Sequence, residues 1–158
     1  MKYSTFLLCS LVALLLLSAC PQHTANPSAL KPRIEKFHQA IRWKDFSAAS
    51  KLLAADKQAL FLNARLHSND INNLSITDYE LEHAEISDDG TTAVCTSRIS
   101  WFRLPQVQEH SALVRSYFVW ENKNWYLEHQ EQGPFPELAP PGLLKPPEVG
   151  LQSPRARN

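Results

Sequence analysis

The chain of 158 residues predicts an α+β fold in which N-terminal helices pack on a bent antiparallel four-stranded sheet. From residue 34 onward, apolar residues recur at i, i+3, i+4 and i+7, which is the spacing of one helix face. Later they alternate with polar residues, as in strands with one buried face. Helices followed by strands are typical of the α+β class. Between Arg33 and Glu131 the only glycine is Gly90 and the only proline is Pro105, so this stretch is expected to be the folded body.

Three helices are expected in the first half of the body. The chain breaks after the first helix at Trp43 and Lys44. Asp45 is a preferred N-cap residue for the second helix, and Asp56 is expected to cap the third. The Asn- and Asp-rich residues 69–73 should end the third helix, because their side chains compete for backbone hydrogen bonds in turns. The apolar stripe of the first helix consists of Ile34, Phe37, His38 and Ile41.

Four strands in a meander are expected in the second half. The apolar phase of the first strand changes near His83, which indicates a β-bulge. The pair Asp89-Gly90 that follows is typical of a hairpin turn. A loop through Pro105 and a polar turn at residues 122–124 separate the remaining strands. The expected strands are 76–87, 92–103, 112–121 and 125–129.

Residues 1–19 have the pattern of a secretory signal peptide. A short polar start carries Lys2, and an apolar run from Phe6 to Leu17 follows. A run of about twelve residues is too short to cross a hydrocarbon core of ~30 Å. The small residues Ser18 and Ala19 then close the segment.

The sequence Leu17-Ser18-Ala19-Cys20 resembles the lipobox of bacterial lipoproteins. The resemblance implies cleavage before Cys20 and a covalent lipid on its thiol, which is the only cofactor expected. The alternative is ordinary secretion with a chance cysteine. Pro21 is not the aspartate that such lipoproteins usually carry for the inner membrane. The resemblance therefore favours a periplasm-facing anchor in the outer membrane.

Two proline-rich stretches flank the body. Residues 20–32 read as the lipidated cysteine and a flexible tether. Residues 132–158 contain seven prolines and three glycines and show no apolar periodicity, so a disordered tail is expected. The tail is either a solvated end or an interaction arm.

The body resembles NTF2-like (cystatin-like cone) domains over residues 33–131. Residues 37–49 are similar to the helix-turn-helix that opens such domains, although Lys44 replaces the usual glycine of the turn. Residues 118–120 and 124–127 are similar to the closing hairpin. The resemblance implies a bent sheet that wraps around a helix and leaves a cone-shaped pocket between them. A generic helix-on-sheet domain without the cone remains the alternative.

Some NTF2-like proteins are ketosteroid isomerases or polyketide cyclases, but no residue of this chain matches their catalytic sites. From the strand phases, four polar residues are candidates to reach a cavity: Tyr79, His83, Arg98 and Tyr117. Each also has an ordinary reading. His83 could lie on the surface at the bulge, strict alternation puts Arg98 on the face opposite Ile99, and the tyrosines could lie at the edge of the core with wet hydroxyls.

Composition and spacing argue against several other functions. With 16 basic and 16 acidic side chains the chain lacks the basic excess of a nucleic-acid-binding protein. The histidines have no metal-ligand spacing, and the i, i+3 pair Glu35 and His38 is more typical of a solvated helix face. Cys95 is a single thiol, either a reactive group or, more simply, a buried apolar side chain.

Two surface features are candidates for contacts with a partner. Residues 78–89 hold six acids and no base, which predicts a solvated acidic ridge or a contact for a basic partner. Trp43 and Trp101 could extend outward as contact anchors. Trp120 and Trp125 are expected in the core.

The sequence therefore predicts a membrane-anchored bacterial lipoprotein whose non-catalytic NTF2-like module binds a protein partner or small ligand in the cell envelope. No catalytic residue, metal or nucleic-acid partner is expected. Two alternatives remain: an isomerase- or cyclase-type enzyme that uses the cone, and a structural subunit of an envelope complex. A hollow, polar-lined cone would favour the enzyme.

Overall fold

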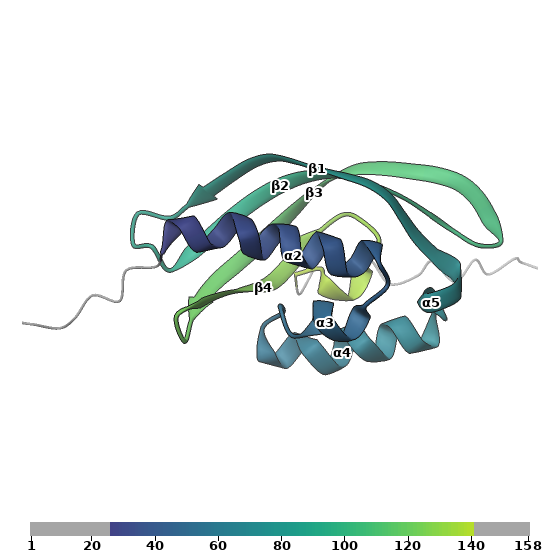
Figure 1. Cartoon of the computed structure of the whole chain (residues 1–158), viewed down its shortest axis with the longest axis horizontal. Coiled ribbons are helices and arrows are strands. Elements are labelled where there is room, and N and C mark those ends of the chain that lie inside the picture. Colours follow the sequence, from purple (N-terminus) through teal and green to yellow (C-terminus); the bar gives the residue numbers. More distant parts are fainter. Residues whose placement is uncertain (1–25, 141–158) are drawn as a thin grey trace, which may run out of the picture.

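A computed structural model describes residues 26–140, in which helices come first and strands follow (Figure 1). The predicted signal peptide, Cys20 and residues 141–158 lie outside the described residues. The elements are η2 (Pro27–Ala29), α2 (Leu30–Arg42), α3 (Phe46–Ser50), α4 (Ala55–His67), α5 (Asp70–Asn73), β1 (Leu74–Ile86), β2 (Thr92–Arg103), β3 (Gln106–Glu121), β4 (Asn124–Glu131) and η3 (Pro136–Leu138). The α+β fold class is confirmed.

The turn between α2 and α3 forms although it lacks the glycine of the resembling domains. Lys44 itself takes the left-handed conformation, with φ of 61°. The backbone N–H of Asp45 donates to the carbonyl of Ala40 at 2.9 Å, which closes the end of α2. The Asp45 carboxylate accepts from the N–H of Ala48 at 2.8 Å, so its predicted N-cap role is confirmed. Asp56 instead lies within the first turn of α4, whose N-cap is Ala54.

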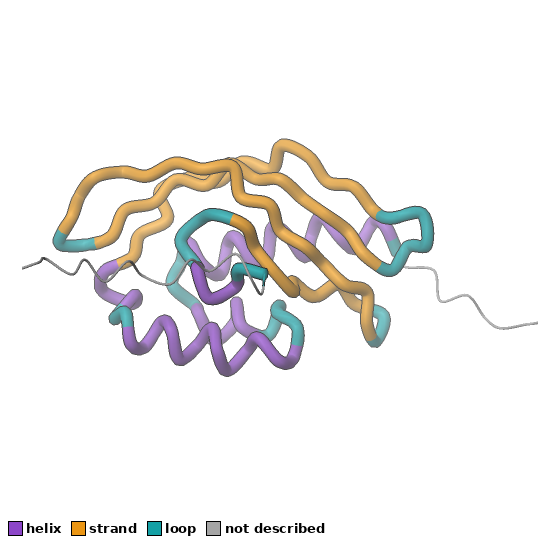
Figure 2. The backbone as a smooth tube through the Cα atoms, turned by 180° about the vertical axis from the view of Figure 1, so that it is seen from behind, coloured by secondary structure: helices purple, strands orange, loops and turns teal. Residues whose placement is uncertain are grey.

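The four strands form one antiparallel sheet in the order β1-β2-β3-β4, as predicted (Figure 2). The strands arch over the helices, which all lie on the inner side of the sheet (Figures 1 and 2). The pairing of β1 with β2 shifts between Leu81 and His83, which confirms the predicted bulge, and shifts a second time between Ile76 and Asp78. Bulges increase local bending, which suits a sheet that wraps a helix.

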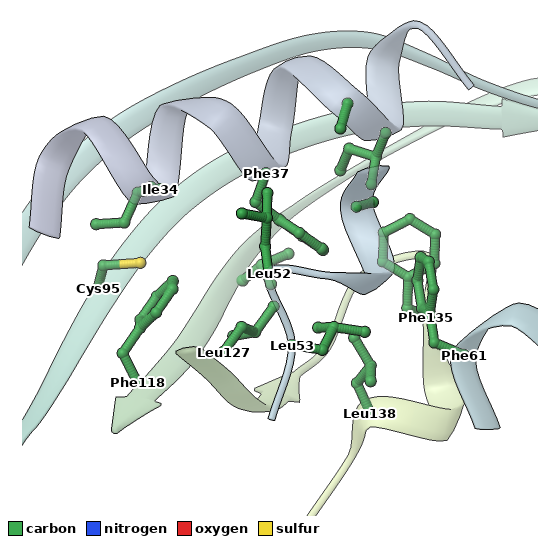
Figure 3. Close-up of a cluster of buried hydrophobic side chains, with 14 of the residues drawn as sticks. Ile34, Phe37, Leu52, Leu53, Phe61, Cys95, Phe118, Leu127, Phe135 and Leu138 are labelled. Carbon is green, nitrogen blue, oxygen red and sulfur yellow. The ribbon is translucent and has the colours of Figure 1, made fainter. Parts of the chain in front are cut away.

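The core lies between the inner face of the sheet and helices α2, α3 and α4 (Figure 3). Phe37 from α2 and Phe61 from α4 meet there with ring centroids 6.4 Å apart. Cys95 and Phe118 fill the sheet side. Trp125 is buried as predicted, and its indole N–H donates to the carbonyl of Asn26 at 3.3 Å.

Both predicted borders of the body are wrong. Leu30, which the sequence places in the tether, is buried at the start of α2. On the other side, the chain turns back at Gln132 and Gly133, which both have positive φ. It then buries Phe135 and Leu138 in the core. Two buried apolar side chains offset the cost of ordering this proline-rich segment, and composition alone does not show that.

Within residues 26–140, no helix is long and apolar enough to cross a membrane.

Candidate functional site

Buried apolar side chains from the helices, the sheet and the C-terminal segment point into the space between the sheet and the helices (Figure 3). Phe135 reaches in from the C-terminal segment and packs edge-on against Phe61, with ring centroids 5.3 Å apart, and against Phe37 at 6.4 Å. Leu53 and Leu127 close the space from the α3–α4 connection and from β4, and both are fully buried. The interior therefore functions as a packed core.

The structure does not bring the four predicted pocket residues together. Tyr79 alone faces the helices, since its cross-strand partner is the buried Ile99. Arg98 lies opposite Leu113, and both are exposed on the outer face of the sheet. His83 and Tyr117 share that outer face, as their exposed or half-buried partners show. The β-bulge at residue 82 moves His83 to the outer face.

On the outer face these residues form ordinary surface contacts. Arg98 Nη2 donates to the Glu82 carboxylate at 2.6 Å, which neutralises part of the predicted acidic ridge. The Tyr117 hydroxyl donates to Glu131 Oε1 at 2.7 Å, and this bond raises the pKa of the tyrosine. His83 lies 3.8 Å from Glu85, with both side chains largely exposed.

His38 lies in the core, so its interpretation as half of a solvated pair with Glu35 is wrong. Its ring stacks on Tyr79 with centroids 4.5 Å apart and planes 11° from parallel. Burial lowers the pKa of His38 to about 4, so the imidazole is neutral at pH 7. With 1% of its surface exposed, His38 offers no access to a substrate.

The inner face of the sheet also carries small polar side chains that the sequence reasoning missed. Ser97, Ser116 and Gln130 are buried there beside Cys95. Gln130 Nε2 donates to Ser116 Oγ at 2.9 Å. Burial raises the pKa of Cys95 to about 11, so the thiol is inert at pH 7, as the buried-residue reading expects. Strict alternation on β2 and β3 could have placed Ser97 and Ser116 inward.

A buried cluster of charges holds the C-terminal segment in place. Arg65 of α4 contacts Glu137 at 2.5 Å and Asp70 at 3.0 Å. Its guanidinium stacks 4.5 Å from the ring centre of Phe135. Arg103 of β2 also pairs with Asp70 and donates to the carbonyl of Pro134 at 3.3 Å. Burial raises the pKa of Glu137. These contacts join α4, α5, β2 and the C-terminal segment.

An apolar groove of about 450 Å³ opens on the surface between α3, α4 and α5. We call it the distal groove and define it by Lys44, Phe46, Leu62, Leu66 and Ile71. Leu66 is 77% exposed and Ile71 is 54% exposed, so both apolar side chains face solvent. The sequence reasoning missed this groove, because it depends on how three helix ends meet.

The expected division of the tryptophans holds for Trp43 and Trp125 only. Trp120, expected in the core, is half-buried and packs against it. Trp43, which precedes Lys44 in the chain, is 76% exposed and is a candidate contact residue. Trp101 is half-buried, with its ring stacked 5.7 Å from that of His110. Among residues 26–140, no group of three or more histidine, cysteine or acidic side chains could hold a metal ion.

No protein-family model and no curated protein matches the sequence. Solved structures share the fold. A ketosteroid isomerase-like protein from Erwinia carotovora atroseptica aligns with a TM-score of 0.53 and 9% identity, over 65% of this chain and 91% of that one. The intermembrane-space region of chloroplast protein ARC6 aligns at 0.51 and 10% identity, over 67% and 95%. A SEC-C motif-containing protein from Rhodopseudomonas palustris aligns at 0.51 and 16% identity, over 61% and 73%.

These likenesses and the topology show that the chain has an NTF2-like fold. The identities are low, and one scaffold hosts many functions, so the likenesses carry no activity over to this chain.

Proposed function

We propose that this chain is a lipid-anchored bacterial lipoprotein whose NTF2-like module is non-catalytic and binds a protein partner in the cell envelope. The observation that carries the proposal is the filled interior, since the chamber in which a small-molecule enzyme of this fold would work is occupied by core side chains. The distal groove supports binding instead, because it exposes apolar side chains on the surface.

The anchor rests on the lipobox-like sequence that ends at Cys20. Several acyl chains on one residue would give stable membrane attachment, because each buried CH₂ contributes about 0.8 kcal/mol. Cys20→Ala should therefore release the protein into the soluble periplasmic fraction. Membrane-bound Cys20→Ala protein would contradict the anchor, and recovery of the unsubstituted chain in the inner-membrane fraction would contradict an outer-membrane location.

An isomerase- or cyclase-type enzyme is supported less well. The four candidate pocket residues do not share a cavity. Among residues 26–140, the histidine with a strongly shifted pKa is His38, which is shielded from solvent. Its pKa shift arises from burial alone, whereas a catalytic group must also reach its substrate.

Crosslinking in intact cells, followed by detergent extraction and mass spectrometry of the tagged chain, tests the binding function. We expect one envelope protein to be recovered reproducibly and in constant ratio to the chain. Recovery of the chain alone, at several crosslinker lengths, would contradict the proposal. Stoichiometric recovery of a large complex would favour a structural subunit.

A further inference from the structure

The distal groove lies at the end of the domain opposite the point where the N-terminal segment enters. Asn26 is held at the start of β4, beside the β3–β4 turn, by the indole of Trp125. The other end of the sheet is the β2–β3 hairpin, where the N–H of Leu104 donates to the carbonyl of Asn73 at the end of α5. Strand β3 joins the two ends and has 16 residues, or about 50 Å at the usual rise. Figure 1 shows α5 and the first turn of α2 at opposite ends of the domain.

This placement sets the groove away from the membrane that holds the lipid. Only five residues of sequence separate Cys20 from Asn26, so the two can lie at most about 20 Å apart. The end with Asn26 therefore stays near the lipid, and the distal groove can face outward into the envelope. This step rests on the proposed function, because it assumes the lipid on Cys20.

Two cationic side chains line the groove, Lys44 and Arg65, and Arg65 is already paired with Asp70 and Glu137. The Lys44 ammonium donates to the carbonyl of Ile71 at 3.0 Å. Among residues 26–140, neither Lys44 nor the neighbouring Arg42 forms an ion pair with a carboxylate. Asp45, which also lines the groove, uses its carboxylate to cap α3. Lys44 thus has no carboxylate of residues 26–140 within ion-pair distance.

Lys44 holds this position at a conformational cost. A non-glycine residue with φ of 61° is strained, and such strain tends to persist where a side chain has a use. A glycine would relieve the strain but would leave the groove without its ammonium group.

We propose that the distal groove binds an apolar helical segment of a partner protein that carries acidic side chains beside its apolar face. The concave shape and the volume of about 450 Å³ suit protruding apolar side chains. The Lys44 ammonium supplies the complementary charge and would steer an acidic segment toward the groove. A flat membrane surface fits a concave groove less well, and the anchored end already faces the membrane.

The test uses the full mature chain with Cys20→Ala, so that no detergent is needed to compete for the groove. The probe is a fluorescein-labelled amphipathic helix of about 18 residues, long enough to be helical, with leucine on one face and glutamate beside it. The comparison peptide has lysine in place of glutamate. Anisotropy gives the affinities, and we expect the lysine peptide to bind at least about tenfold more weakly, a difference of about 1.4 kcal/mol.

Matched variants locate the site. Leu66→Ser and Lys44→Glu should each weaken the glutamate peptide at least about tenfold, while Leu113→Ser, which alters an exposed leucine on the outer face of the sheet, should leave it unchanged. Circular dichroism and the melting temperature report whether each variant is folded. If Leu66→Ser were unfolded, Lys44→Glu, which alters a half-buried side chain and keeps a non-glycine residue in the turn, would decide alone.

Three results of the peptide assay would overturn the inference. They are equal binding of both peptides, loss of binding in Leu113→Ser but not in Leu66→Ser, and binding to anionic phospholipid vesicles in place of the glutamate peptide. If the chain formed dimers that Leu66→Ser dissociates, a second copy of the chain would be the occupant of the groove, and this result would also overturn the inference. The in-cell crosslinking separates the two levels. A partner retained equally by Leu66→Ser would refute the groove and leave the proposed function standing.

Discussion

Replacing Phe135 tests whether the C-terminal segment belongs to the core. The Phe135 side chain is 1% exposed and packs on Phe37, Phe61 and the guanidinium of Arg65. Truncating such a phenylalanine to alanine costs about 3–5 kcal/mol, because apolar burial is lost and a cavity remains. We therefore expect Phe135→Ala to lower the free energy of unfolding by about 4 kcal/mol, a large part of the 5–15 kcal/mol typical of a domain.

Urea unfolding followed by tryptophan fluorescence measures this change. Leu113→Ala is the control, because its exposed side chain should cost less than about 0.5 kcal/mol. The slope of unfolding free energy against urea should be unchanged if both variants unfold in two states. A loss below about 1 kcal/mol for Phe135→Ala, within the ordinary range for a surface site, would refute the packing and support a tail that begins at residue 132.

The remaining predictions concern pH, reactivity and backbone strain. The folded-state pKa of His38, about 4, lies below the ordinary value of 6.5, so the unfolded state binds the proton more tightly. The contribution of His38 to the free energy of unfolding is therefore complete above pH 6.5. It falls by about 3 kcal/mol as the pH drops to 4. Denaturant unfolding at pH 7 and pH 4.5 should show this loss, and His38→Phe should reduce it; an equal loss in both proteins would contradict a neutral buried imidazole. Cys95 should resist alkylation by iodoacetamide at pH 8 in the native Cys20→Ala chain and react in urea; rapid native labelling, read by mass spectrometry, would mean that the thiol is accessible. Lys44→Gly should raise the melting temperature, since relief of left-handed strain is worth about 1 kcal/mol, and should weaken binding of the glutamate peptide; a lower melting temperature would show that strain is not the dominant effect.

Much of the fold could be predicted because local patterns and tertiary packing agree. The apolar stripe of α2, the Asp45 cap and the Asp89-Gly90 turn each specify their element locally. The bulge near His83 could be located because the alternation of apolar and polar residues changes phase at that point of the sequence. These features depend on neighbours a few residues away.

The errors arose where distant contacts decide. Composition predicts a disordered tail, but Phe135 and Leu138 find a core built by α2, α4 and β4. The spacing of Glu35 and His38 suggests a solvated pair, but the His38 ring stacks on Tyr79, which lies 41 residues later in the chain. The distal groove is formed by the ends of three helices, so the sequence of no single segment predicts it. Strand phase alone could place a residue on a face but could not show whether that face encloses a cavity.

The proposed binding function requires that the interior between the sheet and the helices is closed to small molecules. Titration of the Cys20→Ala chain with fluorobenzene, followed by ¹⁹F NMR, tests this claim most directly. Engineered apolar cavities bind benzene, so Phe135→Ala is the positive control and should broaden the fluorine signal in a saturable way. We expect no saturable binding by the chain that keeps Phe135. Saturable binding to that chain would show an open apolar chamber and would favour the enzyme hypothesis over the binding function.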